Sequence, residues 1–242
     1  MNIVTKTVLI TGANRGLGQA LAQQALARGA AGVYAGARGA LQNADRRVTA
    51  LKLDVTDGAQ IRRAVQDVGS LDVLINNAGV DLHEGLGERT GIDRHLAVNL
   101  FGTHAVSQAF LPLLARSRSA VVNILSLAAL APVPFSPAYS ISKAAALSLT
   151  RSLRALWASR GVSVHAVLAG PVDTDMTRGL EVPKASAESV AGAIFDAIER
   201  DEEDIFPDPM SAPIAAGWRS GMPKALERQF AVYASPGGAD PA

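Results

Sequence analysis

The sequence predicts an α/β domain in which helices cover both faces of a doubly wound parallel sheet of six to seven strands. Three observations indicate this fold. Short β-branched runs alternate with longer amphipathic segments, the short runs are continuously apolar, and several helical patterns end at a glycine. The 242 residues fit one domain with one core. We therefore expect a single domain over residues 1–234 and a disordered tail over 235–242.

The predicted strands and helices alternate along the chain. Strands are expected at 7–11, 32–36, 48–53, 71–76, 120–125 and 162–168. Helices are expected near 17–28, 58–68, 92–115, 137–160 and 187–200. The segment EEDIFPD adds a seventh strand, and a short helix is expected around 223–232. Only residues 37–47 join the second and third strands, which leaves little room for a full crossover helix.

The composition excludes several classes of function. Basic residues number 23 and acidic residues 22, so we expect no nucleic acid and no membrane as a partner. The absence of cysteine excludes disulfides, thiolate metal sites and a cysteine nucleophile. The first residues, MNIVTK, lack the pattern of a secretory signal, and we expect a cytoplasmic protein.

A glycine-rich loop, TGANRGLG at residues 11–18, follows the first strand and opens the first helix. Glycines at such a turn let the backbone approach a pyrophosphate closely, and the helix N-terminus favours the anion. The loop predicts a dinucleotide site. The alternative is an ordinary glycine-rich turn.

The stretch SPAYSISKAAAL, residues 136–147, places Tyr139 and Lys143 four residues apart at the start of a helix. Residues at this spacing lie on one helix face. An ammonium group beside a phenol lowers the phenol pKa, so the pair predicts a tyrosine that exchanges a proton. Ser136 is expected to cap this helix, with Pro137 in its first turn.

These motifs together resemble the short-chain dehydrogenase/reductase family, over residues 7 to about 176. The glycine spacing is Gly-x-x-x-Gly-x-Gly, NNAG follows at 76–79, and Ser126 precedes Tyr139 by thirteen residues. The resemblance implies a Rossmann-like catalytic domain in which Ser126 orients a carbonyl and Tyr139 donates the proton. It further implies that Lys143 lowers the tyrosine pKa and binds the nicotinamide ribose, and that Asn99 holds a water linking the lysine to solvent.

The end of the second strand favours NADPH/NADP+ over NADH. Ala37 stands where the family has an aspartate, and Arg38 and Arg15 suit a 2′-phosphate, unless both are solvated surface charges. Asp54 and Thr174 are expected at the adenine and the carboxamide, while Ala169 replaces the family's proline and leaves the path of residues 168–186 open. The expected cofactor-binding residues are Gly12, Asn14, Arg15, Gly16, Leu17, Gly18, Arg38, Asp54, Val55, Asn77, Ala78, Gly79, Tyr139, Lys143, Gly170, Val172 and Thr174.

The segments expected to close the substrate pocket are apolar, and they include a substrate loop at about 176–186. They predict a hydrophobic or aryl ketone as the substrate, although the same residues could fill core instead. The expected wall residues are Leu82, His83, Leu86, Ala128, Val133, Phe135 and Met176. No Gly-x-Ser-x-Gly motif is present, and the four histidines are scattered without the spacing of a metal site.

The predicted function is therefore an NADPH-dependent carbonyl reductase that interconverts a ketone and a secondary alcohol. Two alternatives remain open: a non-catalytic protein that senses NADP(H), and an NAD-linked alcohol dehydrogenase. The resemblance also implies a homodimer or homotetramer, formed through the long helices at 92–115 and 137–160.

Overall fold

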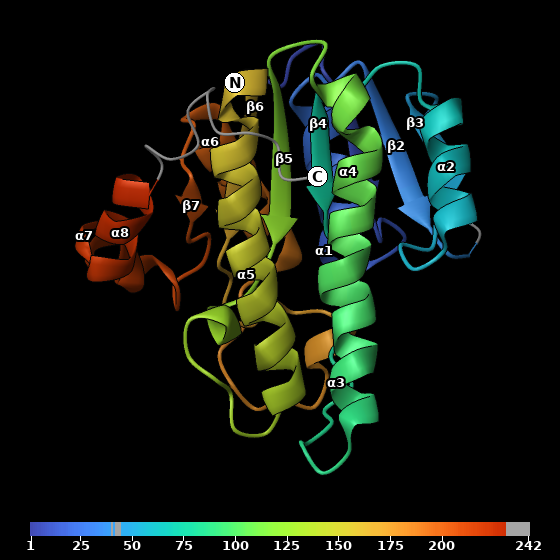
Figure 1. The fold of residues 1–242 in the computed structure, drawn as a ribbon. Coiled ribbons are helices and arrows are strands. Elements are labelled where there is room, and N and C mark those ends of the chain that lie inside the picture. The colour runs from blue at the N-terminus through green and yellow to red at the C-terminus, as the bar shows by residue number, and fades with distance from the viewer. Residues whose placement is uncertain (40, 42–44, 231–242) are drawn as a thin grey trace, which may run out of the picture.

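The computed structural model describes residues 1–39, 41 and 45–230. These residues form a single α/β domain around one parallel sheet in the order β3-β2-β1-β4-β5-β6-β7 (Figure 1). The strands are β1 (Thr7–Thr11), β2 (Gly32–Ala37), β3 (Val48–Lys52), β4 (Val73–Asn76), β5 (Ser119–Ile124), β6 (Val162–Val167) and β7 (Asp204–Ile205). The predicted sheet and its seventh strand are confirmed, whereas the predicted tail at 235–242 lies outside the described residues.

The strand order reverses beside β1, and this reversal positions the site. Val8 of β1 is paired with Val33 of β2 on one side and with Val73 of β4 on the other. The chain thus leaves β1 towards β2 in one half of the sheet and enters β4 in the other half. Such a switch point opens a crevice at the carboxyl ends of the strands, where ligands of this fold class bind.

Helices cover both faces of the sheet, and the alternation along β1 shows why. Val8 and Ile10 belong to one hydrophobic core, and Leu9 belongs to the other. Phe195, a residue of α6 (Ala187–Glu199), fills the first core together with side chains of α1 (Gly16–Ala27). Phe110, a residue of α4 (Thr103–Leu114), fills the second core together with side chains of α2 (Gly58–Asp67) and α5 (Pro137–Trp157). Both faces of the sheet are therefore buried under helices, as its continuously apolar strands predict.

The helix predicted at 92–115 is a composite. It consists of α3 (Arg89–Leu96), a π-helical turn (Ala97–Gly102) and α4. Gly102 lies against Val55, so that a Cβ there would come 2.6 Å from a Val55 methyl group. The wider turn carries Asn99, and π-turns of this kind are frequent at functional sites.

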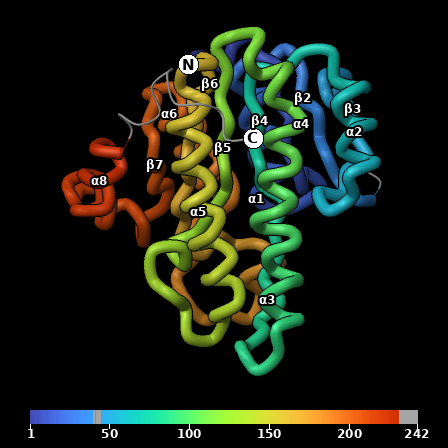
Figure 2. The backbone as a smooth tube through the Cα atoms, in the orientation of Figure 1, coloured from blue at the N-terminus to red at the C-terminus, as the bar shows by residue number. Residues whose placement is uncertain are grey.

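The described residues after β7 form two short helices, α7 (Ala215–Ser220) and α8 (Met222–Phe230), beside the β7 edge of the sheet (Figure 2). Asp204 of β7 holds α7 in place, because it accepts a hydrogen bond from Trp218 Nε1 at 2.8 Å. Asp204 also forms an ion pair with Arg154 of α5, at 2.8 Å. The sequence predicted α8, but it did not predict α7. In the part of the chain that is described, no helix has the length and apolar character needed to cross a bilayer.

Candidate active site

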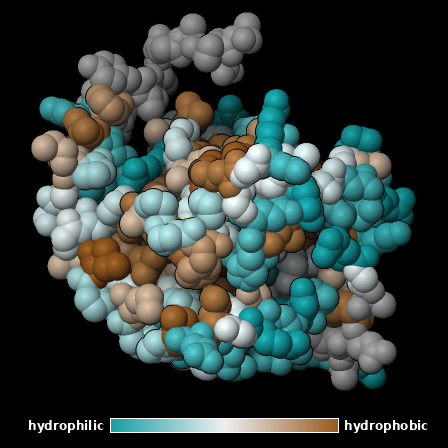
Figure 3. Space-filling model, turned by 90° about the horizontal axis from the view of Figure 1, so that it is seen from below, coloured by the Kyte–Doolittle hydropathy of each residue, from teal (hydrophilic) through white to brown (hydrophobic). Residues whose placement is uncertain are grey.

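A cavity of about 580 Å³ opens at the carboxyl edge of the sheet. Its walls come from the glycine loop, the ends of β2, β4 and β5, the start of α5, and residues 169–180. All the residues predicted to bind the cofactor line it. Seen from this edge, the surface shows hydrophobic side chains gathered among hydrophilic ones (Figure 3).

The glycine loop has the shape that a dinucleotide requires. Gly12 has a φ of +67°, which side chains rarely tolerate. A Cβ on Gly18 would lie 2.2 Å from the carbonyl oxygen of Gly12, so only glycine lets α1 pack this closely on the loop. The Asn77 amide donates to the carbonyls of Thr11 at 2.9 Å and Gly12 at 3.1 Å. Asn77 therefore holds the loop in addition to lining the cavity.

The charges around the loop fit a phosphate group. No acidic residue stands in the first turn of α1, and its first residues, 16–18, line the cavity, where a helix N-terminus favours an anion. Arg38 is exposed and makes no ion pair with any residue that the structure describes. Arg15 is already paired, because its Nη1 lies 2.8 Å from Asp175 Oδ2. Arg38 is thus the arginine of the cavity wall whose charge has no ion-pair partner among the described residues.

The Asp54 side chain lines the cavity after β3. Its Oδ1 accepts hydrogen bonds from the backbone N–H of Thr56 at 2.9 Å and from the Thr56 hydroxyl at 2.7 Å. A different residue, Asp57, caps α2 by accepting from Ala59 and Gln60. The contacts with Thr56 therefore fix the Asp54 carboxylate in the cavity wall.

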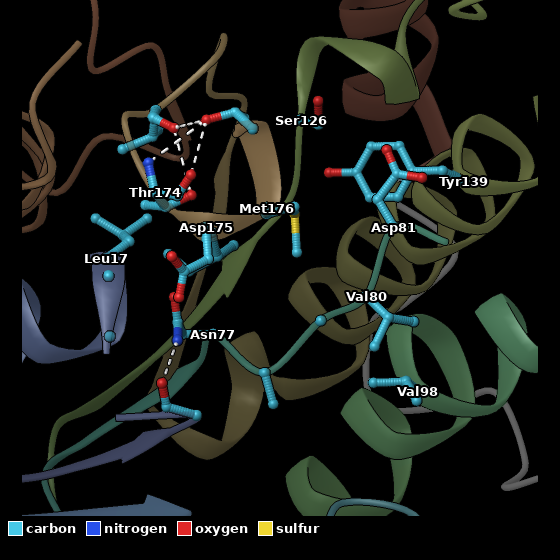
Figure 4. A pocket seen from close by; sticks show the side chains of 18 of the residues that line it. Leu17, Asn77, Val80, Asp81, Val98, Ser126, Tyr139, Thr174, Asp175 and Met176 are labelled. Atoms are coloured by element: carbon cyan, nitrogen blue, oxygen red, sulfur yellow. Dashed lines mark hydrogen bonds between the residues drawn. The ribbon is translucent and has the colours of Figure 1, made fainter. Parts of the chain in front are cut away.

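Ser126, Tyr139 and Lys143 come together in the cavity, as predicted. Ser126 follows β5, and Tyr139 lies in the first turn of α5 (Figure 4). Lys143 lies in the next turn of α5 and lines the same cavity. The Ser126 hydroxyl accepts a hydrogen bond from the backbone N–H of Ala128 at 3.1 Å and lies near Tyr139. The Lys143 ammonium lies 5.6 Å from the Tyr139 ring centroid and donates to the carbonyl of Ile124 at 2.8 Å.

The expected lowering of the Tyr139 pKa is wrong for the protein alone. Burial raises the pKa of Tyr139 to about 12, the nearby Ser126 hydroxyl opposes this rise, and the negative charge of Asp81 adds to it. Burial also lowers the pKa of Lys143 to about 8, against the opposing effect of Asp81. The sequence pattern correctly brought ammonium and phenol together, but desolvation outweighs their attraction. Tyr139 is consequently held in its protonated, proton-donating form.

Ser136 stands at the N-cap position of α5, but its hydroxyl does not cap the helix. The hydroxyl instead donates to Asp81 Oδ1 at 2.5 Å. Asp81 lines the cavity, and the sequence analysis missed it. A signal was available, because Asp81 is the first charged residue after the NNAG turn that ends β4.

Asn99 lies behind the cavity wall and is buried. Its Oδ1 accepts from the N–H of Val80 at 2.9 Å, and its Nδ2 donates to the carbonyl of Val80 and the hydroxyl of Ser142, both at 2.9 Å. Asn99 therefore fixes the backbone that leads from the NNAG turn into Asp81. Its implied role in holding a water stays a prediction.

The predicted substrate wall is partly wrong. Ala128, Val133, Phe135 and Met176 line the cavity, but Leu82, His83 and Leu86 lie outside its wall. The loop after β4 turns away from the cavity because His83 adopts a φ of +52° and its backbone N–H donates a hydrogen bond to Asp81 Oδ1 at 3.0 Å. The side chains of Leu82 and Leu86 are exposed as a result.

The segment after β6 is fixed by a residue far along the chain. Asp208 Oδ2 accepts from the N–H of Gly170 at 2.8 Å, and Asp208 is itself buried. This contact restrains the turn at which Ala169 replaces the family's proline. Thr174 and Thr177 then close a capping box that shapes the cavity side of the segment. Within the described ranges, no cluster of three or more histidine, aspartate or glutamate residues is arranged to hold a metal ion.

Comparisons with known proteins agree with this geometry. The family model of the short chain dehydrogenases matches residues 6–184. The 1-deoxy-11-beta-hydroxypentalenate dehydrogenase of Streptomyces exfoliatus is 34% identical, and the alignment covers 85% of this chain and 84% of that protein. The 2-(R)-hydroxypropyl-CoM dehydrogenase of Xanthobacter autotrophicus is 32% identical, over 72% of this chain and 78% of the relative.

A solved structure extends the similarity to the whole fold. The crystal structure of a short-chain dehydrogenase from Burkholderia cenocepacia J2315, in complex with NADP, superimposes with a TM-score of 0.86 at 34% identity. The superposition covers 95% of this chain and 99% of that chain. The comparisons thus match most of the sequence. They agree with the sheet order, the glycine loop and the group of Ser126, Tyr139 and Lys143. The chain belongs to the short-chain dehydrogenase family and is an oxidoreductase that acts on hydroxyl or carbonyl groups.

Proposed function

We propose that the protein is an NADPH-dependent carbonyl reductase that acts on a hydrophobic ketone. The observation that carries this proposal is the meeting of Ser126, Tyr139 and Lys143 in one cavity with the glycine loop. Bound NADPH would supply the hydride for the carbonyl carbon. The chain's own residues have to bind the cofactor, hold the carbonyl and supply the proton.

The catalytic residues divide this work by position. The Ser126 hydroxyl can hold the carbonyl oxygen next to the Tyr139 hydroxyl, because both residues line the same cavity. Tyr139, kept protonated by burial, donates its proton to the oxygen as negative charge develops there. The buried Lys143 places a positive charge beside the phenol as the proton leaves.

The preference for NADPH rests on Arg38. Its exposed guanidinium lines the cavity at the end of β2, where Ala37 supplies no carboxylate to bind ribose hydroxyls. The relative from Burkholderia cenocepacia was solved in complex with NADP, which supports the same choice of cofactor.

The experiment is the oxidation of NADPH and NADH by the purified protein, over a panel of aryl, aliphatic and cyclic ketones. We expect turnover with NADPH, less with NADH, and loss of most turnover in Tyr139→Phe. Tight NADPH binding without turnover of any ketone would favour a sensor of NADP(H) instead. Faster turnover of alcohols with NAD+ would favour an NAD-linked dehydrogenase.

A further inference from the structure

Asp81 places a carboxylate in the part of the cavity that receives the substrate. Its side chain is 10% exposed and lines the cavity, and Figure 4 shows it on the side of Tyr139, across the view from Leu17 and Thr174. The contact with Ser136 holds this carboxylate at the N-terminal end of α5, where Ser136 precedes Tyr139 by three residues. The charge of Asp81 contributes to raising the pKa of both Tyr139 and Lys143, which shows that it lies close to these groups.

One oxygen of this carboxylate is held and the other is free. Oδ1 accepts from the hydroxyl of Ser136 at 2.5 Å and from the N–H of His83 at 3.0 Å. Among the described residues, Oδ2 makes no hydrogen bond and no ion pair. The two contacts to Oδ1 orient the carboxylate, and they leave Oδ2 available to a ligand.

No lysine or arginine among the described residues forms an ion pair with Asp81. His95 Nε2 lies 3.7 Å from Oδ1, but it accepts the N–H of Leu82 at 3.0 Å, while Nδ1 lies 2.7 Å from the carbonyl of Gly91. This arrangement fixes a neutral ring with its proton on Nδ1. His83 Nδ1 lies 3.6 Å away on an exposed side chain, and Lys143 donates to the carbonyl of Ile124.

The other charged residues that line the cavity belong to the dinucleotide end, to an ion pair or to the catalytic group. Arg15, Arg38 and Asp54 belong to the dinucleotide end, Asp175 is paired with Arg15, and Lys143 belongs to the catalytic group. Apolar side chains form the remaining wall near the mouth, among them Val133, Phe135, Met176 and Leu180. Asp81 is thus the charge that a substrate would meet within an apolar pocket.

We infer, resting on the proposed reductase function, that the substrate is an amino ketone, with an apolar body and a cationic amine close to the carbonyl. The amine lies on the carbon next to the carbonyl or on the following one, where it meets Asp81 Oδ2 while the carbonyl oxygen meets Ser126 and Tyr139. A carboxylate that is partly shielded from water attracts a cation more strongly than an exposed one does. Asp81 is therefore a specificity-determining residue.

The test uses two ketones of the same shape. Phenacyltrimethylammonium carries a permanent charge, and neopentyl phenyl ketone replaces its nitrogen by carbon. We expect kcat/KM with NADPH to be about tenfold or more higher for the cation. In Asp81→Asn, which keeps an oxygen acceptor for Ser136, this ratio should fall by about tenfold or more.

Glu84→Gln is the matched control. Glu84 lies on the same loop, but its carboxylate pairs with Arg94 at 2.5 Å and lies outside the cavity wall. Removing its charge should leave the ratio unchanged. A wild-type ratio of one or less, or a ratio that survives in Asp81→Asn, would overturn the inference. If Asp81→Asn fails to fold, the wild-type ratio decides, with a carboxylate-bearing ketone expected to be the poorest substrate.

Calorimetric titration of both ketones into the protein saturated with NADP+ separates this inference from the proposed function. If no ketone is turned over, the reductase proposal fails, but the binding data still decide the role of Asp81. Tighter binding of the cation by about tenfold, lost in Asp81→Asn, would support the inference. Equal binding of the two probes would overturn it.

Discussion

Ser136 stands at the N-cap position of α5, the helix that carries Tyr139, and its hydroxyl donates a hydrogen bond to Asp81 Oδ1. The contact joins the loop after β4 to the start of α5, which are 55 residues apart in the sequence. It places the carboxylate against the N-terminal end of the helix that carries the proton donor. The electrostatics of the site consequently depend on a loop residue as well as on the Ser126, Tyr139 and Lys143 group.

Tyr139→Phe should abolish most of the turnover and preserve cofactor binding. The substitution removes the proton donor and keeps the ring, so kcat is expected to fall by about 10²–10⁴-fold. The dissociation constant of NADPH, measured by its fluorescence, should stay within about threefold of wild type. Turnover close to wild type in this variant would remove Tyr139 from the mechanism.

Arg38→Asp should shift the preference from NADPH towards NADH. A carboxylate in place of the guanidinium repels the 2′-phosphate, and the ratio of kcat/KM for the two cofactors should fall by about tenfold or more. Arg63→Asp makes the same change of charge on α2, outside the cavity wall, and should leave the ratio in place. An unchanged ratio in Arg38→Asp would assign the 2′-phosphate to other residues.

Two glycine substitutions should have opposite effects on stability. In Gly18→Ala the new methyl group would meet the Gly12 carbonyl oxygen at 2.2 Å, so both the melting temperature and NADPH affinity should fall. In Gly192→Ala, within α6, a Cβ meets nothing within 4 Å, and the helix should gain about 0.5–1 kcal/mol. Thermal melts with and without NADPH measure both effects. An equal loss of stability in the two variants would contradict the close packing of α1 on the loop.

The pH dependence of reduction should report on Asp81. Burial raises the pKa of Tyr139 to about 12 with a further contribution from the Asp81 charge, and that charge also raises the pKa of Lys143 against the effect of burial. Reduction consumes the Tyr139 proton, so its rate falls as the pH rises through this pKa. Removing the charge lowers both pKa values, and the alkaline fall should begin at a lower pH in Asp81→Asn.

The profile of kcat/KM against pH for a neutral ketone measures this shift, and oxidation of the alcohol should rise at a lower pH in the same variant. Glu84→Gln should keep the wild-type profile. A movement of the alkaline limb to higher pH in Asp81→Asn would contradict the arrangement of charges.

The sequence was informative wherever a motif reports on backbone or on fixed spacing along one helix. The glycine loop, the strand alternation and the Tyr139–Lys143 spacing each follow from local rules, and the structure places all three as predicted. The roles of Asp81 and Asp208 were not predicted, because each depends on a contact with a residue far away in the chain. Asp81 contacts Ser136, and Asp208 contacts Gly170. Leu82 and Leu86 were misplaced because the left-handed backbone of His83 turns the loop outward. The pKa of Tyr139 depends on burial, which spacing alone does not reveal.

The most direct test of the central claim is the transfer of an isotope. The protein is incubated with an aryl ketone and NADPH that carries deuterium at the hydride-donating position, and the products are analysed by mass spectrometry. If the protein is a carbonyl reductase, one of the two deuterated stereoisomers of NADPH yields an alcohol with deuterium on its carbinol carbon, and Tyr139→Phe yields almost none. If both isomers give no alcohol, or an alcohol without deuterium, hydride transfer at this site is contradicted.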